Sequence, residues 1–239
     1  MLSEKLSKYH LILASKSPRR QFLLKELGLN FEIRTKDIDE SFPKGLKGKQ
    51  IALYLCKKKA AAFKNELNPN DLLITADTIV WIGNKVLNKP ADYNEACKML
   101  KMLSGKMHTV YTGVCITSPP SPLPRERGVR QDGVRSFVVS TKVFFKKLTS
   151  AEIDFYVSNY KPYDKAGAYG AQECLPAGVN PCSKSEVRFL KKLKKLSMIN
   201  KSMNTKAGIG YVGVEKIIGS YFNVMGLPVK ELYEQLMKL

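Results

Sequence analysis

The chain has 239 residues, of which 44% are hydrophobic and 26% are charged, and it includes 16 glycines and 12 prolines. This composition excludes collagen-like, low-complexity and disordered chains, and the length suits one large domain or two small ones. Five cysteines without a CxxC pair and only two histidines argue against a disulfide scaffold and a His/Cys zinc site.

The 40 basic and 21 acidic residues give a net charge of +19. Such an excess favours polyanionic partners, either nucleic acids or phosphorylated small molecules. The chain contains no run of about 18 apolar residues that would cross a membrane. Its first residues also lack the apolar core and cleavage pattern of a signal peptide. We therefore expect a soluble cytoplasmic protein with reduced thiols.

Strands and helices alternate along the first half of the sequence. The apolar run 11–14 predicts a strand, and Ser17-Pro18 predicts the start of a helix that ends at Gly28, because serine caps helices and proline suits their first turn. Four more elements follow: a strand near 31–35, a helix over 50–66, a hairpin of 72–82 and 85–87 turning at Gly83-Asn84, and a helix over 92–103 opened by the capping pair Asp92 and Glu95.

The second half continues the same pattern and predicts a mixed α/β fold. Its expected elements are strands over 108–117 and 136–145, a helix over 149–159 opened by a capping box of Thr149 and Glu152, a strand over 209–218 and a helix over 228–238.

Two segments interrupt this alternation. Residues 118–135 are rich in proline and arginine and show no periodicity. Residues 173–207 hold eight basic and two acidic residues, and 186–198 predicts a basic helix with an apolar stripe. We therefore predict a single domain over residues 1–239 that carries inserts at 118–135 and 173–207.

The first helix begins with two arginines in the sequence Ser15-Lys16-Ser17-Pro18-Arg19-Arg20. Cations are unfavourable at this end, which carries the positive pole of the helix dipole, and a bound anion would remove the conflict. Backbone N–H groups, serine hydroxyls and guanidinium groups all suit phosphate oxygens. The alternative is a solvated helix start whose arginines point into water.

An acidic residue, Asp77, lies inside the apolar strand predicted over 72–82. An ionised carboxylate there costs roughly several kcal/mol unless it is paired or bound to a metal. It is therefore a candidate general base or metal ligand, and Lys89-Pro90 follows across the hairpin. The alternative is a structural aspartate at a bulge or in an ion pair.

Three further segments carry weaker signals. The acidic run 36–40 and the lysines 57–59 are each typical of a solvated surface. Residues 164–172 differ, because small residues there let a ligand approach the backbone closely. Gln172 at their end has a paired donor and acceptor that can recognise the edge of a base. An ordinary glycine-rich loop is the alternative.

Taken in order, these motifs resemble the Maf family of nucleoside triphosphate pyrophosphatases, a family also associated with septum formation. The resemblance spans the chain apart from the two inserts, and its motifs are SxSPRR at 15–20, ADT at 76–78, Lys89-Pro90, Leu103-Ser104-Gly105 with His108, DKAGAYGAQ at 164–172, and Gly219-Ser220-Tyr221 with Gly226-Leu227-Pro228.

The resemblance implies a Maf/ITPase-like mixed sheet with flanking helices, in two lobes around a central cleft. It implies a metal-dependent hydrolysis of the α–β phosphoanhydride, with Mg²⁺ or Mn²⁺ as the metal and a homodimer as the usual assembly. Asp77 would activate water and share the metal with Asp39. The family's substrate-binding positions correspond here to Ser15, Arg19, Arg20, Lys59, Thr78, Lys89 and Gln172.

The motifs also indicate a branch of the family. The 7-methyl-GTP branch has tryptophan after SP, SDQ in place of ADT and no YGxQ, whereas this chain has SPRR, ADT and YGAQ. These residues resemble the dTTP/UTP branch, so pyrimidine nucleoside triphosphates, modified ones included, are the expected substrates. Arg19, Thr78 and Gln172 are the positions that the resemblance ties to substrate choice.

Two other functions remain open from the residues. One is a catalytically impaired protein that binds nucleic acid through the lysine-rich insert, although 173–207 contains only one aromatic residue, Phe189, for stacking on bases. The other is a regulator of cell division, for which no residue indicates a partner.

Overall fold

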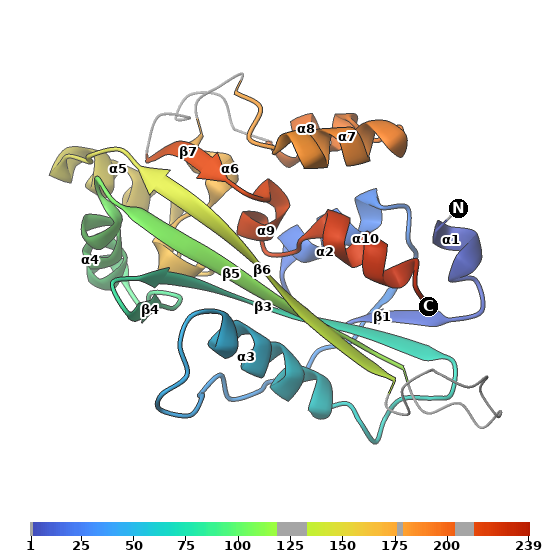
Figure 1. Ribbon diagram of the computed structural model, residues 1–239. Helices are drawn as coiled ribbons and strands as arrows, with labels where there is room; N and C mark the ends of the chain where they lie inside the picture. Colours follow the sequence, from blue (N-terminus) through green and yellow to red (C-terminus); the bar gives the residue numbers. More distant parts are fainter. Residues whose placement is uncertain (1, 119–132, 176–178, 204–212) are drawn as a thin grey trace. The chain divides into compact units, whose positions relative to one another are not determined.

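The computed structural model describes residues 2–118, 133–175, 179–203 and 213–239 (Figure 1). The described helices are α1 (Leu2–Lys5), α2 (Pro18–Glu26), α3 (Lys49–Ala61), α4 (Tyr93–Leu103), α5 (Ser150–Tyr160), the 3-10 turn η1 (Ala166–Ala168), α6 (Ala171–Cys174), α7 (Lys184–Lys192), α8 (Ser197–Ser202), α9 (Tyr221–Met225) and α10 (Val229–Leu236). The described strands are β1 (His10–Leu13), β2 (Glu32–Ile33), β3 (Asp71–Ile82), β4 (Lys85–Leu87), β5 (Met107–Thr117), β6 (Val134–Phe145) and β7 (Val214–Ile218).

The strands form one mixed sheet in the order β2-β1-β3-β5-β6-β7, and β4 pairs with β3. β1 is parallel to both β2 and β3, whereas the β3–β4 and β6–β7 pairs are antiparallel. β3 and β4 form the predicted hairpin, and Asn84 adopts the positive φ of 63° that its tight turn requires. The mixed α/β class expected from the sequence is confirmed. Within the described residues, the structure has no helix that is both long and apolar enough to span a membrane.

The chain divides into two compact units. The first comprises residues 1–77, 112–138 and 229–239, and the second comprises 78–111 and 139–228. Asp77 therefore ends a segment of the first unit, and Thr78 begins a segment of the second.

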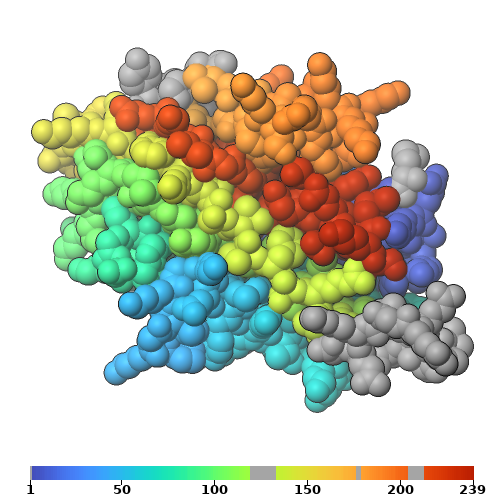
Figure 2. Space-filling model, viewed as in Figure 1, coloured from blue at the N-terminus to red at the C-terminus, as the bar shows by residue number. Residues whose placement is uncertain are grey.

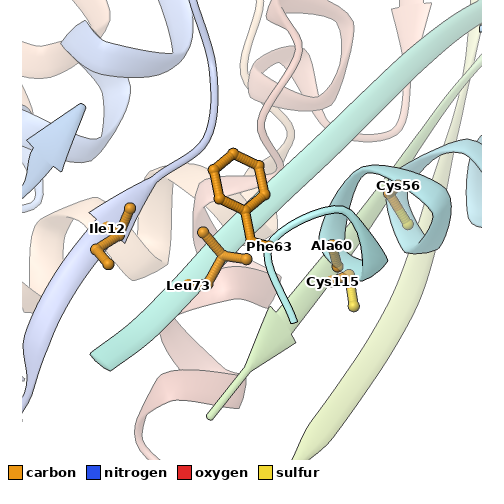
Figure 3. Close-up of a cluster of buried hydrophobic side chains, with 6 residues drawn as sticks. All are labelled: Ile12, Cys56, Ala60, Phe63, Leu73 and Cys115. Carbon is orange, nitrogen blue, oxygen red and sulfur yellow. The ribbon is translucent and has the colours of Figure 1, made fainter. Parts of the chain in front are cut away.

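The core of the first unit lies between α3 and the sheet (Figure 3). Phe63, which follows α3, packs with Ile12 of β1 and Leu73 of β3, and each is at most 1% exposed. The backbones of α3 and β5 also approach closely, because a Cβ on Gly113 would lie only 2.3 Å from the carbonyl oxygen of Ala52. Glycine at this position lets α3 pack tightly on the sheet.

Aromatic side chains form part of the core of the second unit. The rings of His108, Phe145 and Tyr169 meet edge to face, with centroids 4.9–5.4 Å apart, and all three residues are buried. His108 Nε2 lies 2.7 Å from the Tyr169 hydroxyl. Tyr169 is thereby fixed both by packing and by a hydrogen bond.

Helix capping agrees with the sequence at two sites and differs at a third. Asp92 caps α4, and Thr149 and Glu152 form the predicted capping box of α5. Ser17 occupies the N-cap position of α2, but its side chain makes no capping hydrogen bond, contrary to expectation.

The basic segment also differs from its prediction. The single helix expected over 186–198 is divided into α7 and α8, because Lys194 between them adopts a positive φ of 58°. Leu190 of the expected apolar stripe is fully buried, whereas Leu196 is 40% exposed. Most of the insert predicted at 118–135, and residues 209–212 of the expected last strand, lie outside the described residues.

Candidate active site

The loop between β1 and α2 is organised by Ser15, which is buried. Its hydroxyl accepts hydrogen bonds from the backbone N–H of Ser17 (3.2 Å) and from Nη1 of Arg20 (3.4 Å). Its carbonyl oxygen accepts a third, from the Gln21 side chain (3.1 Å). The loop therefore turns back on itself and brings a guanidinium group to the N-terminal end of α2.

The N-terminal end of α2 suits an anion. Its first turn contains no acidic residue, and no side chain caps it at Ser17. The first backbone N–H groups of a helix have no partner within the helix, and they carry the positive end of its dipole. With Arg19 and Arg20 in the same turn, this end of the helix has the chemistry that phosphate or carboxylate oxygens require.

Asp77 is the last residue of a buried stretch of β3. Residues 71–77 are all buried, and Asp77 itself is 6% exposed. Because Asp77 lies at the end of this buried stretch, water screens its charge little. Its interactions with neighbouring charges are therefore stronger than those of an exposed carboxylate.

Lys59, on the last turn of α3, joins two carboxylates. Its ammonium donates hydrogen bonds to Oδ1 of Asp77 and to Oε1 of Glu40, the latter at 2.7 Å. Its side chain is 17% exposed, so the pair with Asp77 is largely shielded from solvent. The ammonium thus neutralises part of the negative charge that Asp77 and Glu40 place together.

The three carboxylates of the acidic run 36–40 have different partners. Asp37 pairs with Lys16 at 2.7 Å. Asp39 accepts hydrogen bonds from the backbone and hydroxyl of Ser41 and lies 3.1 Å from Nζ of Lys58. Only Glu40 shares a cation with Asp77.

Burial dominates the electrostatics of this site. It raises the pKa of Asp77, and the charges of Lys59 and Arg20 oppose that rise. Burial also lowers the pKa of Arg20, while the negative charge of Asp77 acts in the opposite direction. A carboxyl group with a raised pKa is a stronger base once ionised, which suits a group that takes a proton from water.

The remaining predicted substrate-binding residues belong to the second unit. Thr78 is half-buried in β3, Lys89 is exposed after β4, and Gln172 is half-buried in α6. Oε1 of Gln172 is buried and has no hydrogen-bond partner among the described residues. Whether these three residues bind substrate stays a prediction.

The loop that carries Gln172 is held by buried tyrosine and charged side chains. The hydroxyl of Tyr156 accepts from the backbone N–H of Gly170 (3.0 Å) and donates to Glu173 (2.6 Å), which lies 3.5 Å from Nζ of Lys165. Gly170 also leaves room for that carboxylate, since a Cβ there would lie 2.7 Å from Oε2 of Glu173. Gly170 thus serves close packing against Glu173.

The sequence did not single out Glu40 from its neighbours. Asp39 and Glu40 are adjacent, both are acidic, and the loop that carries them has no regular structure, so periodicity could not decide between them. Among the described residues, no three His, Cys, Asp or Glu side chains converge in a way that could hold a metal ion without further ligands.

The sequence is similar to a family of known proteins over most of its length. Residues 10–186 match the family model described as Maf-like protein. A dTTP/UTP pyrophosphatase of Phocaeicola vulgatus is 43% identical over 237 residues, which cover 99% of each chain. Proteins with the same description are 41% identical in Bacteroides thetaiotaomicron (98% of each chain) and 41% identical in Flavobacterium johnsoniae (100% of each chain).

One solved structure, a nucleoside-triphosphatase / dITP/XTP pyrophosphatase from Mycobacterium abscessus, is similar with a TM-score of 0.40. It shares 12% sequence identity over 82% of this chain and 98% of that one. That likeness is weak, and the family assignment does not depend on it.

Proposed function

The chain belongs to the Maf family, and we propose that it hydrolyses dTTP and UTP, or modified pyrimidine nucleoside triphosphates, to the monophosphate and pyrophosphate. One observation carries the proposal: a buried aspartate, Asp77, whose raised pKa suits a base, is paired with a lysine and lies close enough to Arg20, in the first turn of α2, for that charge to affect its pKa. The proposal treats residues 1–239 as one Maf domain with 118–135 and 173–207 added to it.

Asp77 acts on the attacking water. Its carboxylate accepts a proton as the water oxygen attacks the α-phosphorus, and the bond from that phosphorus to the bridging oxygen breaks. Burial raises the pKa of Asp77, so its ionised form accepts a proton more readily than an exposed aspartate does. The positive charge of Lys59 favours that ionised form.

The cations of the first unit neutralise the triphosphate. A lysine ammonium has three donors, and Lys59 uses two of them on Glu40 and Asp77, so one remains for a phosphate oxygen. Arg19 and Arg20, with the hydroxyl of Ser15 and the backbone N–H groups of α2, bind further oxygens. The family resemblance assigns a phosphate-binding role to Lys89 as well.

A divalent metal fits this carboxylate set. Mg²⁺ is commonly held by one or two carboxylates together with substrate phosphates and water, which agrees with the absence of a larger ligand cluster among the described residues. Asp77 and Glu40, which share Lys59, are the pair that we propose to hold it, and Asp39 is the candidate that the family resemblance implies. Such an ion, Mg²⁺ or Mn²⁺, would withdraw negative charge from the phosphates and from the bound water.

The side chain of Gln172 takes part in the proposed selection of the base. Thymine and uracil present an imide N–H between two carbonyl oxygens. The side-chain amide of Gln172 matches this edge, because Oε1 can accept from the imide N–H while Nε2 donates to a carbonyl. The buried Oε1 atom without a partner among the described residues is consistent with that role. Thr78 and Arg19 complete the proposed selection.

Pyrophosphate release from dTTP, UTP, CTP, ATP and 7-methyl-GTP, with Mg²⁺ or Mn²⁺, tests the proposal. We expect release from dTTP and UTP that is lost in Asp77→Asn. Preference for 7-methyl-GTP would retain the reaction and reject the selection by Arg19, Thr78 and Gln172. Release from none of them by folded protein would reject the activity. Light scattering on the same protein tests the proposed homodimer.

A further inference from the structure

Residues 179–203 of the second unit carry an unusual concentration of positive charge. This stretch, which holds α7 and α8, has a single acidic residue, Glu186. Its seven basic residues are Lys184, Arg188, Lys191, Lys192, Lys194, Lys195 and Lys201.

Glu186 is turned inward and is 2% exposed. It closes the capping box of α7 with Ser183, and it accepts hydrogen bonds from the hydroxyl of Ser220 (2.6 Å) and the backbone N–H of Tyr221 (3.2 Å). Its charge is therefore satisfied by the N-terminal ends of α7 and α9. No acidic residue of this stretch is left on its exposed surface to offset the cations.

The cations of this stretch are exposed, except Lys195, which is half-buried. Six of the seven, Lys184, Arg188, Lys191, Lys192, Lys194 and Lys195, form no ion pair with any residue that the structure describes. Lys184 and Arg188, and Arg188 and Lys192, are spaced four apart in α7, where like charges repel and destabilise a helix. Figure 2 shows side chains of this orange segment projecting outward from the surface.

We propose that this surface, the basic face of α7 and the residues up to Lys195, binds the phosphate backbone of nucleic acid without regard to sequence. A helix of nine residues is roughly 13 Å long, and duplex DNA presents about one negative charge per 1.7 Å of its axis. Closely spaced cations therefore match the charge density of duplex DNA better than that of an acidic peptide. The proposal goes beyond the hydrolytic function and does not depend on it.

The chemistry of the face favours backbone contact over base contact or membrane binding. Binding to a membrane surface requires a helix to insert its apolar side, but Leu190 on that side of α7 is already fully buried in the protein. Phe189 is the only aromatic residue of the stretch and is half-buried, so the face lacks the rings on which bases stack.

A shallow hollow whose lining is mainly apolar lies at the start of α7, and it has two cations among its lining residues. It has a volume of about 570 Å³ and is lined by Asn180, Cys182, Lys184, Val187 and Arg188. Lys184 and Arg188 bring two cations to it, and Val187 lies between them in sequence. An Arg and a Lys together can hold a phosphate by charge and by hydrogen bonds.

Fluorescence anisotropy of the full chain with a labelled 20-base-pair duplex of mixed sequence, at several salt concentrations, tests the proposal. The logarithm of the association constant should fall linearly with log salt, with a slope of roughly 0.9 for each duplex phosphate contacted. The variant K184Q/R188Q/K191Q/K192Q, which loses four cations, should therefore lower the slope by up to about 3.6 and weaken binding by roughly tenfold or more at low salt.

The matched control removes four exposed lysines from elsewhere in the second unit, in K98Q/K101Q/K106Q/K147Q, and changes the net charge equally. Thermal unfolding of both variants checks that they are folded. The proposal is supported if only the α7 variant loses binding and slope. It is overturned by an equal loss in the control, by no binding of the wild type at low salt, or by tighter binding to phosphatidylserine vesicles or polyglutamate than to the duplex.

Discussion

The ammonium of Lys59 donates a hydrogen bond to the carboxylate of Asp77, and the two meet where α3 ends and the buried half of β3 ends. Burial disfavours the ionised carboxylate, while the lysine favours it. Their balance determines how much of Asp77 is available as a base at a given pH. Glu40 on the same ammonium adds a second negative charge at the site.

Replacing Asp77 by asparagine should remove hydrolysis and leave the fold intact. The loss of a general base lowers kcat by about 10²–10⁴-fold. Because the folded-state pKa of Asp77 is raised, its ionised form lowers stability at neutral pH, and the uncharged asparagine should raise Tm there. This gain should shrink as the pH falls towards the pKa of Asp77. Activity assays and calorimetry at pH 8 and pH 5 check both parts, and an inactive variant with a lower Tm at pH 8 would contradict the second.

Glu40 and Asp39 should differ in their effect on metal dependence. Glu40 shares Lys59 with Asp77, whereas Asp39 is held by Ser41 and Lys58. We expect Glu40→Gln to raise the Mg²⁺ concentration for half-maximal activity by at least tenfold, and Asp39→Asn to change it less than threefold. Titrations of Mg²⁺ at saturating dTTP measure this difference. A larger increase in the Mg²⁺ requirement for Asp39→Asn than for Glu40→Gln would instead assign the metal to Asp39, as the family resemblance implies.

The pH dependence of hydrolysis should change when the positive charge of Lys59 beside Asp77 is removed. The acidic limb of kcat/KM reports ionisation of the base in the free enzyme, so it should lie above the ordinary aspartate range. Lys59→Met removes a positive charge that lowers the pKa of Asp77, and the limb should therefore move to higher pH.

Lys58→Met is the matched control, because its partner is Asp39 and it has no hydrogen bond to Asp77. The acidic limb of kcat/KM for Lys58→Met should stay at the wild-type pH, even if the rate itself changes. A limb that moves equally in both variants, or in neither, would show that Asp77 does not titrate there.

Local signals explain which parts of the fold were predictable. The capping pair Asp92 and Glu95, the box Thr149 and Glu152 and the turn at Gly83-Asn84 each act within a few residues, so the sequence displays them directly. Asp77 could also be singled out from the sequence, because burying a carboxylate in an apolar strand costs free energy unless the charge is paired, whatever the rest of the fold is.

Long-range contacts explain what could not be predicted. Ser183 and Glu186 have the spacing of a capping box, but the bonds from Glu186 to Ser220 and Tyr221 join residues more than thirty positions apart. That Glu40, and not Asp39, shares Lys59 with Asp77 likewise depends on where a loop without regular structure meets α3. The side chain of Ser17 makes no capping hydrogen bond, and its backbone N–H donates to the hydroxyl of Ser15, a contact that the capping pattern does not predict.

His108 should make the stability of the protein depend on pH between about 6.5 and 3. Burial lowers its pKa from 6.5 to about 3, so the unfolded chain binds a proton in this range and the folded chain does not. Stability should therefore fall as the pH decreases from 6.5, by up to roughly 1.4 kcal/mol per pH unit from this group alone.

His108→Gln removes the titrating group and keeps an amide that can reach the Tyr169 hydroxyl. Urea unfolding at pH 6.5 and pH 5, where most carboxylates remain ionised, should show a smaller loss for the variant than for the wild type. An equal loss would assign the dependence to other groups. The same measurement on Tyr169→Phe, which keeps His108, should retain the wild-type dependence.

A comparison of Glu186 with Glu152 measures how much the contact between Glu186 and α9 adds to the stability of the protein. Both close a capping box, of α7 and of α5 respectively, but only Glu186 also caps the N-terminal end of α9. Loss of a cap costs about 0.5–2 kcal/mol, and each buried donor left without a partner adds roughly 1–3 kcal/mol. Glu186→Ala should therefore destabilise the protein by several kcal/mol, since Ser220 and the N–H of Tyr221 lose their acceptor. Glu152→Ala should cost about 1 kcal/mol, because its site is partly solvated. Urea unfolding with a shared m-value measures both, and equal losses would mean that the contact between α7 and α9 adds nothing to stability.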